Sequence, residues 1–175
     1  LGITVIDADL IAKDAASKNS KAYKNIVDHF GKKILDDLQD IDRKKLRDII
    51  FSKPSQKKIL ESFLHPVIRE NITNQILSSE SHYTIIMVPL IFETNSMNQY
   101  QRILVIDCDE ELQISRATKR DNSSKEDIQK ILNSQASREE RLGIADEVIL
   151  NNSSIELLQE EVLKVHKIYT DLVNG

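Results

Sequence analysis

An apolar, β-branched run that stops at two carboxylates constrains the fold most: Ile3-Thr4-Val5-Ile6-Asp7-Ala8-Asp9, with a helix-like pattern from Leu10. Such a run is typical of a buried parallel strand, apolar on both faces and polar at its carboxyl end. Ligands of open α/β sheets bind at that end. Successive side chains of a strand point to opposite faces, so at most one of the two acids faces a given ligand. Asp is also a preferred helix N-cap, and a capping role for Asp7 or Asp9 is an equal alternative.

The composition is that of a globular protein with one domain, or one domain carrying a sizeable insertion. The chain has 175 residues, of which 40% are hydrophobic and 30% charged. A net charge of -4 argues against general nucleic-acid binding. The single cysteine, Cys108, excludes an internal disulfide and fits a reducing compartment such as the cytoplasm. No apolar run is long enough to span a membrane, and we expect no membrane partner.

The segment from residue 10 to 79 reads as helical throughout. We expect a helix from Asp14 to Phe30, a second over 43–51 capped by Asp42, and a third that opens at Pro54. His65-Pro66 should interrupt this third helix, and a further helix should follow it. The segment is much longer than a simple crossover between strands, so we interpret it as a helical insertion.

The second half alternates strands with helices. Strands are expected at 83–88, 102–107 and 147–150. Helices are expected at 110–119, with Asp109 as its cap, and at 153–172, with Ser153 and Glu156 spaced as a capping box. With the first strand this makes four strands. The fold class is therefore α/β, a parallel sheet with helices on both faces.

An arginine-bearing helical stretch lies between Arg116 and Arg141. Serines at 124 and 137 are each followed by an acid three residues later, which predicts two short capped helices. One interpretation is a solvated helical pair, because acids are interleaved with the basic residues. The other is a mobile lid whose arginines close over phosphates, since a guanidinium binds phosphate oxygens bidentately and stays charged.

Five segments stand out along the chain: Val5-Ile6-Asp7-Ala8-Asp9, Leu64-His65-Pro66, Val88-Pro89-Leu90, Gln135-Ala136-Ser137-Arg138 with Arg141-Leu142, and Ala145-Asp146 through Asn151. Taken together, in this order and spacing and across essentially the whole chain, they resemble the dephospho-CoA kinase family. The resemblance implies a P-loop kinase fold. It also implies ATP-dependent phosphorylation of the ribose 3′-hydroxyl of dephospho-CoA, the last step of coenzyme A synthesis, with Mg²⁺ as cofactor. ATP and dephospho-CoA are then the partners, and the protein is expected to be a monomer or a small homo-oligomer.

The resemblance also divides the chain into parts. Residues 1–9, 80–122 and 142–175 would form the nucleotide-binding core, 10–79 a helical CoA-binding insertion, and 123–141 the lid.

The same resemblance assigns roles to individual residues. Asp9 would be the catalytic acid that orients the ribose hydroxyl, accepts its proton and holds Mg²⁺ through water, whereas Asp7 would support it or cap the next helix. Substrate contacts would come from His65, Pro89 and Leu90, although a histidine before proline is as often structural. The remaining assignments concern ATP: Arg116 and Arg138 as catalytic and nucleotide-binding, and Arg141 and Asn151 as nucleotide-binding.

The chain departs from the family pattern at its start. The family places a strand, a G-x-x-x-x-G-K-[ST] loop and a helix before the Val5–Asp9 segment, and the sequence begins at Leu1. The missing strand would be central in the sheet, so the four strands would surround a gap. We therefore expect a strand and a Gly-rich loop to be encoded upstream, and a fragment starting at Leu1 to be inactive alone.

Two other functions remain open on the sequence. The nearer is another P-loop small-molecule kinase, such as a nucleoside monophosphate kinase, with a similar lid and a different acceptor. The farther is a non-catalytic module that binds CoA or a nucleotide, if the phosphate loop is truly absent. Phosphorylation of dephospho-CoA compared with that of AMP, CMP and shikimate separates the kinases.

Overall fold

The computed structural model describes residues 1–175, with the side chain of Pro54 left aside. The chain forms two compact units, Leu1–Val88 and Pro89–Gly175, and each is described in turn. The first unit contains β1 (Thr4–Asp7), α1 (Ala8–Ala15), α2 (Lys21–Phe30), the 3₁₀ turn η1 (Lys32–Ile34), α3 (Arg43–Ser52), α4 (Pro54–Leu77) and β2 (Thr84–Met87). The second contains η2 (Met97–Gln99), β3 (Leu104–Asp107), α5 (Glu110–Asp121), α6 (Lys125–Asn133), α7 (Arg138–Gly143), β4 (Glu147–Leu150) and α8 (Ile155–Asn174).

The four predicted strands are confirmed, and they form two parallel pairs. In the first unit β1 pairs with β2, so that Thr4 lies opposite Thr84 and Asp7 opposite Met87. In the second unit β3 pairs with β4, with Asp107 opposite Leu150. Each pair is a sheet of two strands. The α/β class with parallel strands is therefore confirmed.

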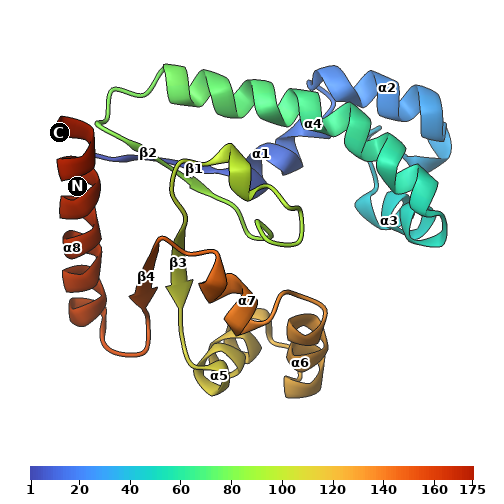
Figure 1. Ribbon diagram of the computed structural model, residues 1–175. Coiled ribbons are helices and arrows are strands. Elements are labelled where there is room, and N and C mark those ends of the chain that lie inside the picture. The colour runs from blue at the N-terminus through green and yellow to red at the C-terminus, as the bar shows by residue number, and fades with distance from the viewer. The chain divides into compact units, whose positions relative to one another are not determined.

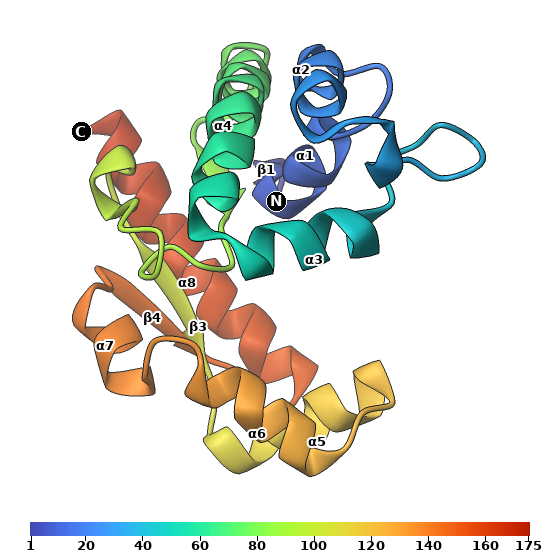
Figure 2. The same cartoon turned by 90° about the vertical axis from the view of Figure 1, so that its right-hand side faces the viewer.

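The helices of the first unit enclose their own core (Figures 1 and 2). Its buried residues come from α2, η1, α3 and α4 and from the loop after η1: Ala22, Ile26, Phe30, Ile34, Leu35, Leu46 and Leu60. Along α2 these apolar residues recur every four positions, the spacing that puts them on one helix face. The helical segment thus has a core of its own, beside the strand pair.

Two predictions within this segment are wrong. The helix expected from Asp14 to Phe30 is two helices, because α1 ends at Ala15 and Ser20 begins a new one. The Ser20 hydroxyl accepts a hydrogen bond from the Ala22 amide at 2.9 Å. Serine favours such capping over a helix interior because its side chain competes for backbone groups.

The second wrong prediction concerns His65-Pro66, which does not interrupt its helix. Pro66 lies inside α4, a single helix of 24 residues. Proline removes the hydrogen bond to the carbonyl of residue 62. However, Phe63 and Leu64 before it and Val67 after it pack against the same core. Burial on both sides of Pro66 therefore outweighs its local preference to end the helix.

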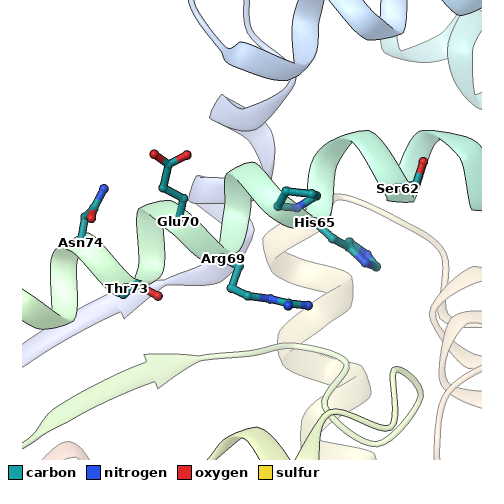
Figure 3. Close-up of a pocket in the computed structure, with 7 residues that line it drawn as sticks. Ser62, His65, Arg69, Glu70, Thr73 and Asn74 are labelled. Atoms are coloured by element: carbon teal, nitrogen blue, oxygen red, sulfur yellow. The ribbon is translucent and has the colours of Figure 1, made fainter.

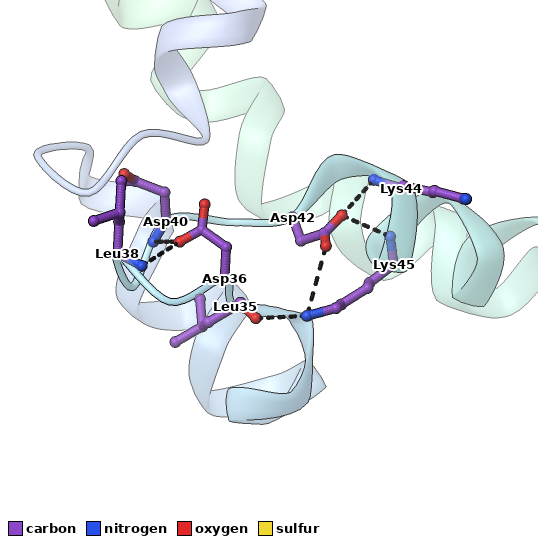
Figure 4. Close-up of polar contacts among 7 residues, drawn as sticks. All are labelled: Leu35, Asp36, Leu38, Asp40, Asp42, Lys44 and Lys45. Carbon is purple, nitrogen blue, oxygen red and sulfur yellow. Dashed lines mark hydrogen bonds and ion pairs between the residues drawn. The ribbon is translucent and has the colours of Figure 1, made fainter.

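Acidic side chains organise the loop before α3 (Figure 4). The Asp36 carboxylate accepts hydrogen bonds from the amides of Leu38 and Asp40, both at 2.9 Å. Asp42 caps α3 as predicted, accepting from the amides of Lys44 and Lys45 at 2.9 and 3.1 Å. These amide hydrogen bonds and the nearby Lys45 ammonium hold the pKa of Asp42 below its usual value.

In the second unit, helices lie on opposite sides of the strand pair (Figures 1 and 2). α8 packs on β4, and α7 contacts β3. The cap of α8 differs from the prediction: Ser154, not Ser153, is the N-cap, and its hydroxyl accepts from the Leu157 amide. Of the two short helices predicted around residues 124–141, α7 has the full capping box, formed by Ser137 and Glu140.

A charged network ties α8 to the amino end of the β3–β4 pair. The Tyr169 hydroxyl donates to one oxygen of Glu147 at 2.7 Å, and Arg102 donates to the other oxygen through its Nε at 2.9 Å. The Glu147 side chain is 10% exposed. Burial, followed by the hydrogen bond to Glu147, raises the pKa of Tyr169.

Tyr169→Phe tests this network. Below pH 10, the ordinary pKa of tyrosine, the neutral hydroxyl stabilises the folded state, and this stability is lost as pH rises towards the higher folded-state pKa. At pH 7 the variant should lose about 1 kcal/mol of unfolding free energy. Above pH 10, thermal unfolding should show a smaller alkaline decline than in the wild type.

Tyr100→Phe is the matched control. Burial raises the pKa of Tyr100, as it does for Tyr169, but the hydrogen bond to Glu147 contributes only at Tyr169. The Tyr100→Phe variant should retain the wild-type alkaline decline more closely than Tyr169→Phe does. Identical alkaline declines in the wild type and Tyr169→Phe would contradict the role given to the Glu147 contact.

Candidate functional site

The carboxyl end of β1 carries the two predicted acids, and the structure separates their positions. β1 stops at Asp7, and α1 begins at the next residue. Asp7 is the N-cap of α1, since its Oδ1 accepts from the amides of Asp9 and Leu10 at 2.9 and 3.1 Å. Its capping role, one of the two predicted alternatives, is therefore present in the structure.

Asp9 lies in the first turn of α1, and its carboxylate remains accessible. The Asp9 side chain is 55% exposed and forms an ion pair with Lys13 at 2.9 Å. An exposed pair of this kind contributes little stability and is readily exchanged for other partners. Asp9 is thus free to contact a ligand hydroxyl or a hydrated cation.

The fit of Mg²⁺ to these residues can be judged from their ligand chemistry. Within the described part of the chain, no three His, Cys, Asp or Glu side chains gather into a metal site. Mg²⁺ does not require such a cage, because it keeps several waters and binds through one or two carboxylates plus substrate phosphates. A single exposed carboxylate such as Asp9 fits this mode.

His65 lies on an open groove along α4 (Figure 3). The hollow measures about 590 Å³ and is lined by Ser62, His65, Pro66, Arg69, Glu70, Thr73 and Asn74. His65 and Arg69 are four residues apart and project from the same side of the helix, whereas Glu70 projects from the other side (Figure 3). Lys21 pairs with Glu70 at 2.6 Å. The imidazole and the guanidinium therefore share one face, and Glu70 is turned towards Lys21.

Three of the residues predicted to bind nucleotide gather at the carboxyl edge of the β3–β4 pair. Arg116, from α5, donates through Nη1 to the carbonyl oxygen of Asn151 at 2.7 Å. The Asn151 amide in turn donates to the carbonyl oxygen of Asp107 at 2.7 Å. Asp107 then binds Arg138 at the start of α7. One connected set of contacts thus joins two arginines to the ends of both strands.

The Arg138–Asp107 contact is the strongest in this set. Arg138 Nε lies 3.0 and 2.9 Å from the two Asp107 carboxylate oxygens, and Nη2 lies 2.6 Å from Oδ2. Asp107 is 5% exposed, whereas the Arg138 side chain is 47% exposed. The hydrogen bond to Asp107 raises the pKa of the Arg138 guanidinium. Such a charge-assisted, forked contact fixes the orientation of the guanidinium plane.

The other predicted residues of the second unit lie on neighbouring loops and helices. Pro89 and Leu90 follow β2, and the carbonyl oxygen of Leu90 accepts from the Thr94 amide at 3.0 Å. Arg141 donates through Nη1 to the carbonyl oxygen of Ala136. Arg141 therefore braces the backbone of the segment that precedes Arg138.

Two carboxylates in this region escaped the sequence reasoning. Besides Asp107, Glu93 accepts from the Ala136 amide at 2.8 Å, across 43 positions of sequence. The available signal for Asp107 was its place as an acid at the end of an apolar strand, the same signal that drew attention to Asp7. For Glu93 no local pattern marks the contact.

Comparisons with known proteins identify the family of the chain. A model of the dephospho-CoA kinase family matches residues 1–156. The dephospho-CoA kinase of Gamma-proteobacterium EBAC31A08 is 51% identical over 174 residues, covering 99% of this chain and 88% of that protein. The dephospho-CoA kinase of Idiomarina loihiensis is 43% identical over 169 residues, covering 97% and 84%.

Solved structures give the same result. The dephospho-CoA kinase from Campylobacter jejuni has a TM-score of 0.68 and 35% identity, covering 97% of this chain and 86% of that one. TT1252 from Thermus thermophilus has a TM-score of 0.83 and 24% identity, covering 95% and 84%, and supports the fold alone. With the family model matched over most of its length, this chain belongs to the dephospho-CoA kinase family.

Proposed function

We propose that this protein transfers the γ-phosphoryl group of ATP to the ribose 3′-hydroxyl of dephospho-CoA. One observation carries the proposal: in a chain of this family, two guanidinium groups and Asn151 converge on the carboxyl edge of the β3–β4 pair. Phosphoryl transfer needs mainly positioning and positive charge around the phosphate oxygens. Arg116 and Arg138 supply that charge, with Asn151 beside them near the adenine.

Asp9 supplies the other requirement, orientation of the attacking hydroxyl. Its exposed carboxylate accepts a hydrogen bond from the ribose hydroxyl. It takes the hydroxyl proton as the bond from the ribose oxygen to the γ-phosphorus forms and the bond from that phosphorus to the β–γ bridging oxygen breaks, which releases ADP. The same carboxylate would hold Mg²⁺ through water, and the ion when bound neutralises charge on the phosphate oxygens.

His65 and Arg69 favour an anionic acceptor at the α4 groove. Their shared face presents an imidazole and a guanidinium to one side of the helix. Dephospho-CoA carries a pyrophosphate, which suits such donors. Pro89 and Leu90 would shape the site floor. Residues 10–79 would act as the CoA-binding part, and 1–9, 80–122 and 142–175 as the nucleotide-binding core.

Residues 123–141 would form the lid. This segment contains α6 and the start of α7, and its arginines Arg138 and Arg141 would meet the ATP phosphates in the closed state. Closure excludes water, which otherwise competes with the ribose hydroxyl as acceptor.

No helix among the described residues is long and apolar enough to cross a bilayer. The proposed substrates and the single Cys108 support a cytoplasmic location, and we propose a monomer or small homo-oligomer. Cell fractionation and sedimentation of the full-length protein test these two points.

The acceptor is tested with the full-length protein, ATP and Mg²⁺. Dephospho-CoA should be phosphorylated with a kcat/KM at least about 10²-fold above that for AMP, CMP or shikimate, because only it pairs a ribose acceptor with the full set of contacts. A preference for AMP or CMP would favour the nucleoside monophosphate kinase alternative. Binding of dephospho-CoA without turnover of any acceptor would favour a binding module.

Asp9→Asn should lower kcat by about 10²–10⁴-fold and leave the fold intact, because the amide cannot accept the hydroxyl proton. Circular dichroism and thermal unfolding check the fold. Asp7→Asn is the matched control: its amide oxygen can still cap α1, so turnover should fall much less. Near-normal turnover of Asp9→Asn would remove Asp9 from the catalytic role.

His65→Ala should raise the KM for dephospho-CoA by about 10-fold, because one hydrogen bond to a charged group is lost. The KM for ATP should change little. His82→Ala is the control, since His82 is an exposed histidine of the same unit outside the groove. An unchanged KM for dephospho-CoA in His65→Ala would assign His65 a structural role within α4.

A further inference from the structure

Among the residues that the structure describes, Asp107 is the one charged residue that is buried. It ends β3, and its carboxylate accepts three hydrogen-bond contacts from Arg138. Its own carbonyl oxygen is taken by the Asn151 amide. The carboxylate is thus bound to one guanidinium, and the backbone at the same residue is fixed to β4.

Burying a carboxylate is costly. The desolvation penalty amounts to several kcal/mol per ion, and a buried ion pair is often no more stable than an apolar replacement. Stability alone is therefore a weak reason for this pair. A geometric role, fixing where the Arg138 guanidinium lies, accounts for it better.

The contact holds Arg138 without covering it. A guanidinium has five N–H donors, and Asp107 engages the Nε side and one edge of Nη2. Nη1 donates no hydrogen bond to any residue in the described structure. Because 47% of the side chain is exposed, a ligand can approach Arg138, and the N–H groups that do not bind Asp107 remain available to an anion.

The backbone before Arg138 is tethered as well. Glu93 accepts from the Ala136 amide at 2.8 Å, and Arg141 donates to the Ala136 carbonyl oxygen. Ser137 and Glu140 close the capping box of α7. Ala136 is 7% exposed. The guanidinium and the main chain that carries it are therefore both fixed within this unit.

We infer that Asp107 is a positioning residue that holds Arg138, before nucleotide binds, with its outer N–H groups directed to where a phosphate group will lie. The inference rests on the proposed function, in which Arg138 meets ATP phosphates. An arginine fixed in advance requires no reorganisation when charge develops on the phosphoryl oxygens. Any movement of the lid then belongs to α6 and the residues before Ala136, while Arg138 stays in place.

A double-mutant cycle in the full-length enzyme tests the inference through activity. Asp107→Asn places an N–H group or a weaker acceptor against the Arg138 donors, so kcat should fall about 10²-fold through misplacement of the guanidinium. The KM for ATP should move much less. In the Arg138→Ala background, Asp107→Asn should lower kcat by less than about a further 2-fold, because its effect passes through Arg138. A merely structural role would make the two losses multiply.

Asp109→Asn is the matched control. Asp109 lies two residues further, its side chain is 64% exposed, and its oxygen is 3.8 Å from Arg138 Nη2. Its turnover should stay within about 2-fold of wild type, as expected for an exposed pair. Wild-type kcat in Asp107→Asn, or equal losses in Asp107→Asn and Asp109→Asn, would overturn the inference.

A second measurement does not depend on activity or on the folding of Asp107→Asn. In ¹⁵N NMR spectra of the nucleotide-free wild type, the Arg138 Nε–H signal, assigned with Arg138→Lys, should exchange slowly with water. Fast exchange there, with a turnover loss in Arg138→Ala, keeps the proposed function and overturns the inference. Normal turnover in Arg138→Ala overturns both.

Discussion

Parallel pairing brings the carboxyl ends of two strands to one edge, and the polar chemistry of both units depends on that constraint. In the second unit it places Asp107 opposite Leu150, so that Asn151 follows directly beside the Asp107 backbone. Arg116 and Arg138 reach this edge from helices that follow β3 in the sequence. In the first unit the same geometry places Asp7 opposite Met87, at the end of both strands. An antiparallel pair would have sent these groups to opposite edges.

The edge of the β3–β4 pair departs from the rule that buried positions are apolar. A well-packed apolar residue in place of Asp107 would avoid the desolvation cost but would leave Arg138 without a fixed partner. Local departures of this kind are expected where a site needs a particular orientation more than it needs stability. The surrounding contacts also fix orientation, since the Glu93 carboxylate accepts from the Ala136 amide and Arg141 donates to the Ala136 carbonyl oxygen.

The sequence predicts the strands well because their signal is local. The run Val148–Leu150 is apolar and bounded by polar residues, and the strand occupies Glu147–Leu150. Helix ends are predicted less well, since adjacent serines can both serve as N-cap. At the start of α8 the N-cap is Ser154 and not Ser153. Pro66 misleads for another reason, because packing on both sides of it keeps α4 continuous. The resemblance named Arg138 and Asn151, but Glu93 could not be found, since its contact spans 43 positions and no pattern marks it.

Asp7 and Asp107 carry the same sequence signal, an acid that ends an apolar strand, yet the structure uses them differently. The difference follows from the distance between strand and helix. α1 begins directly after Asp7, so its carboxylate turns back to cap the amides of Asp9 and Leu10. After Asp107 two further residues come before α5, and Asp109 occupies the N-cap position. Asp107 is thereby released from capping and can bind a side chain from elsewhere in the unit. In this chain, the number of residues between strand and helix thus separates the acid that caps its own helix from the acid that binds a side chain.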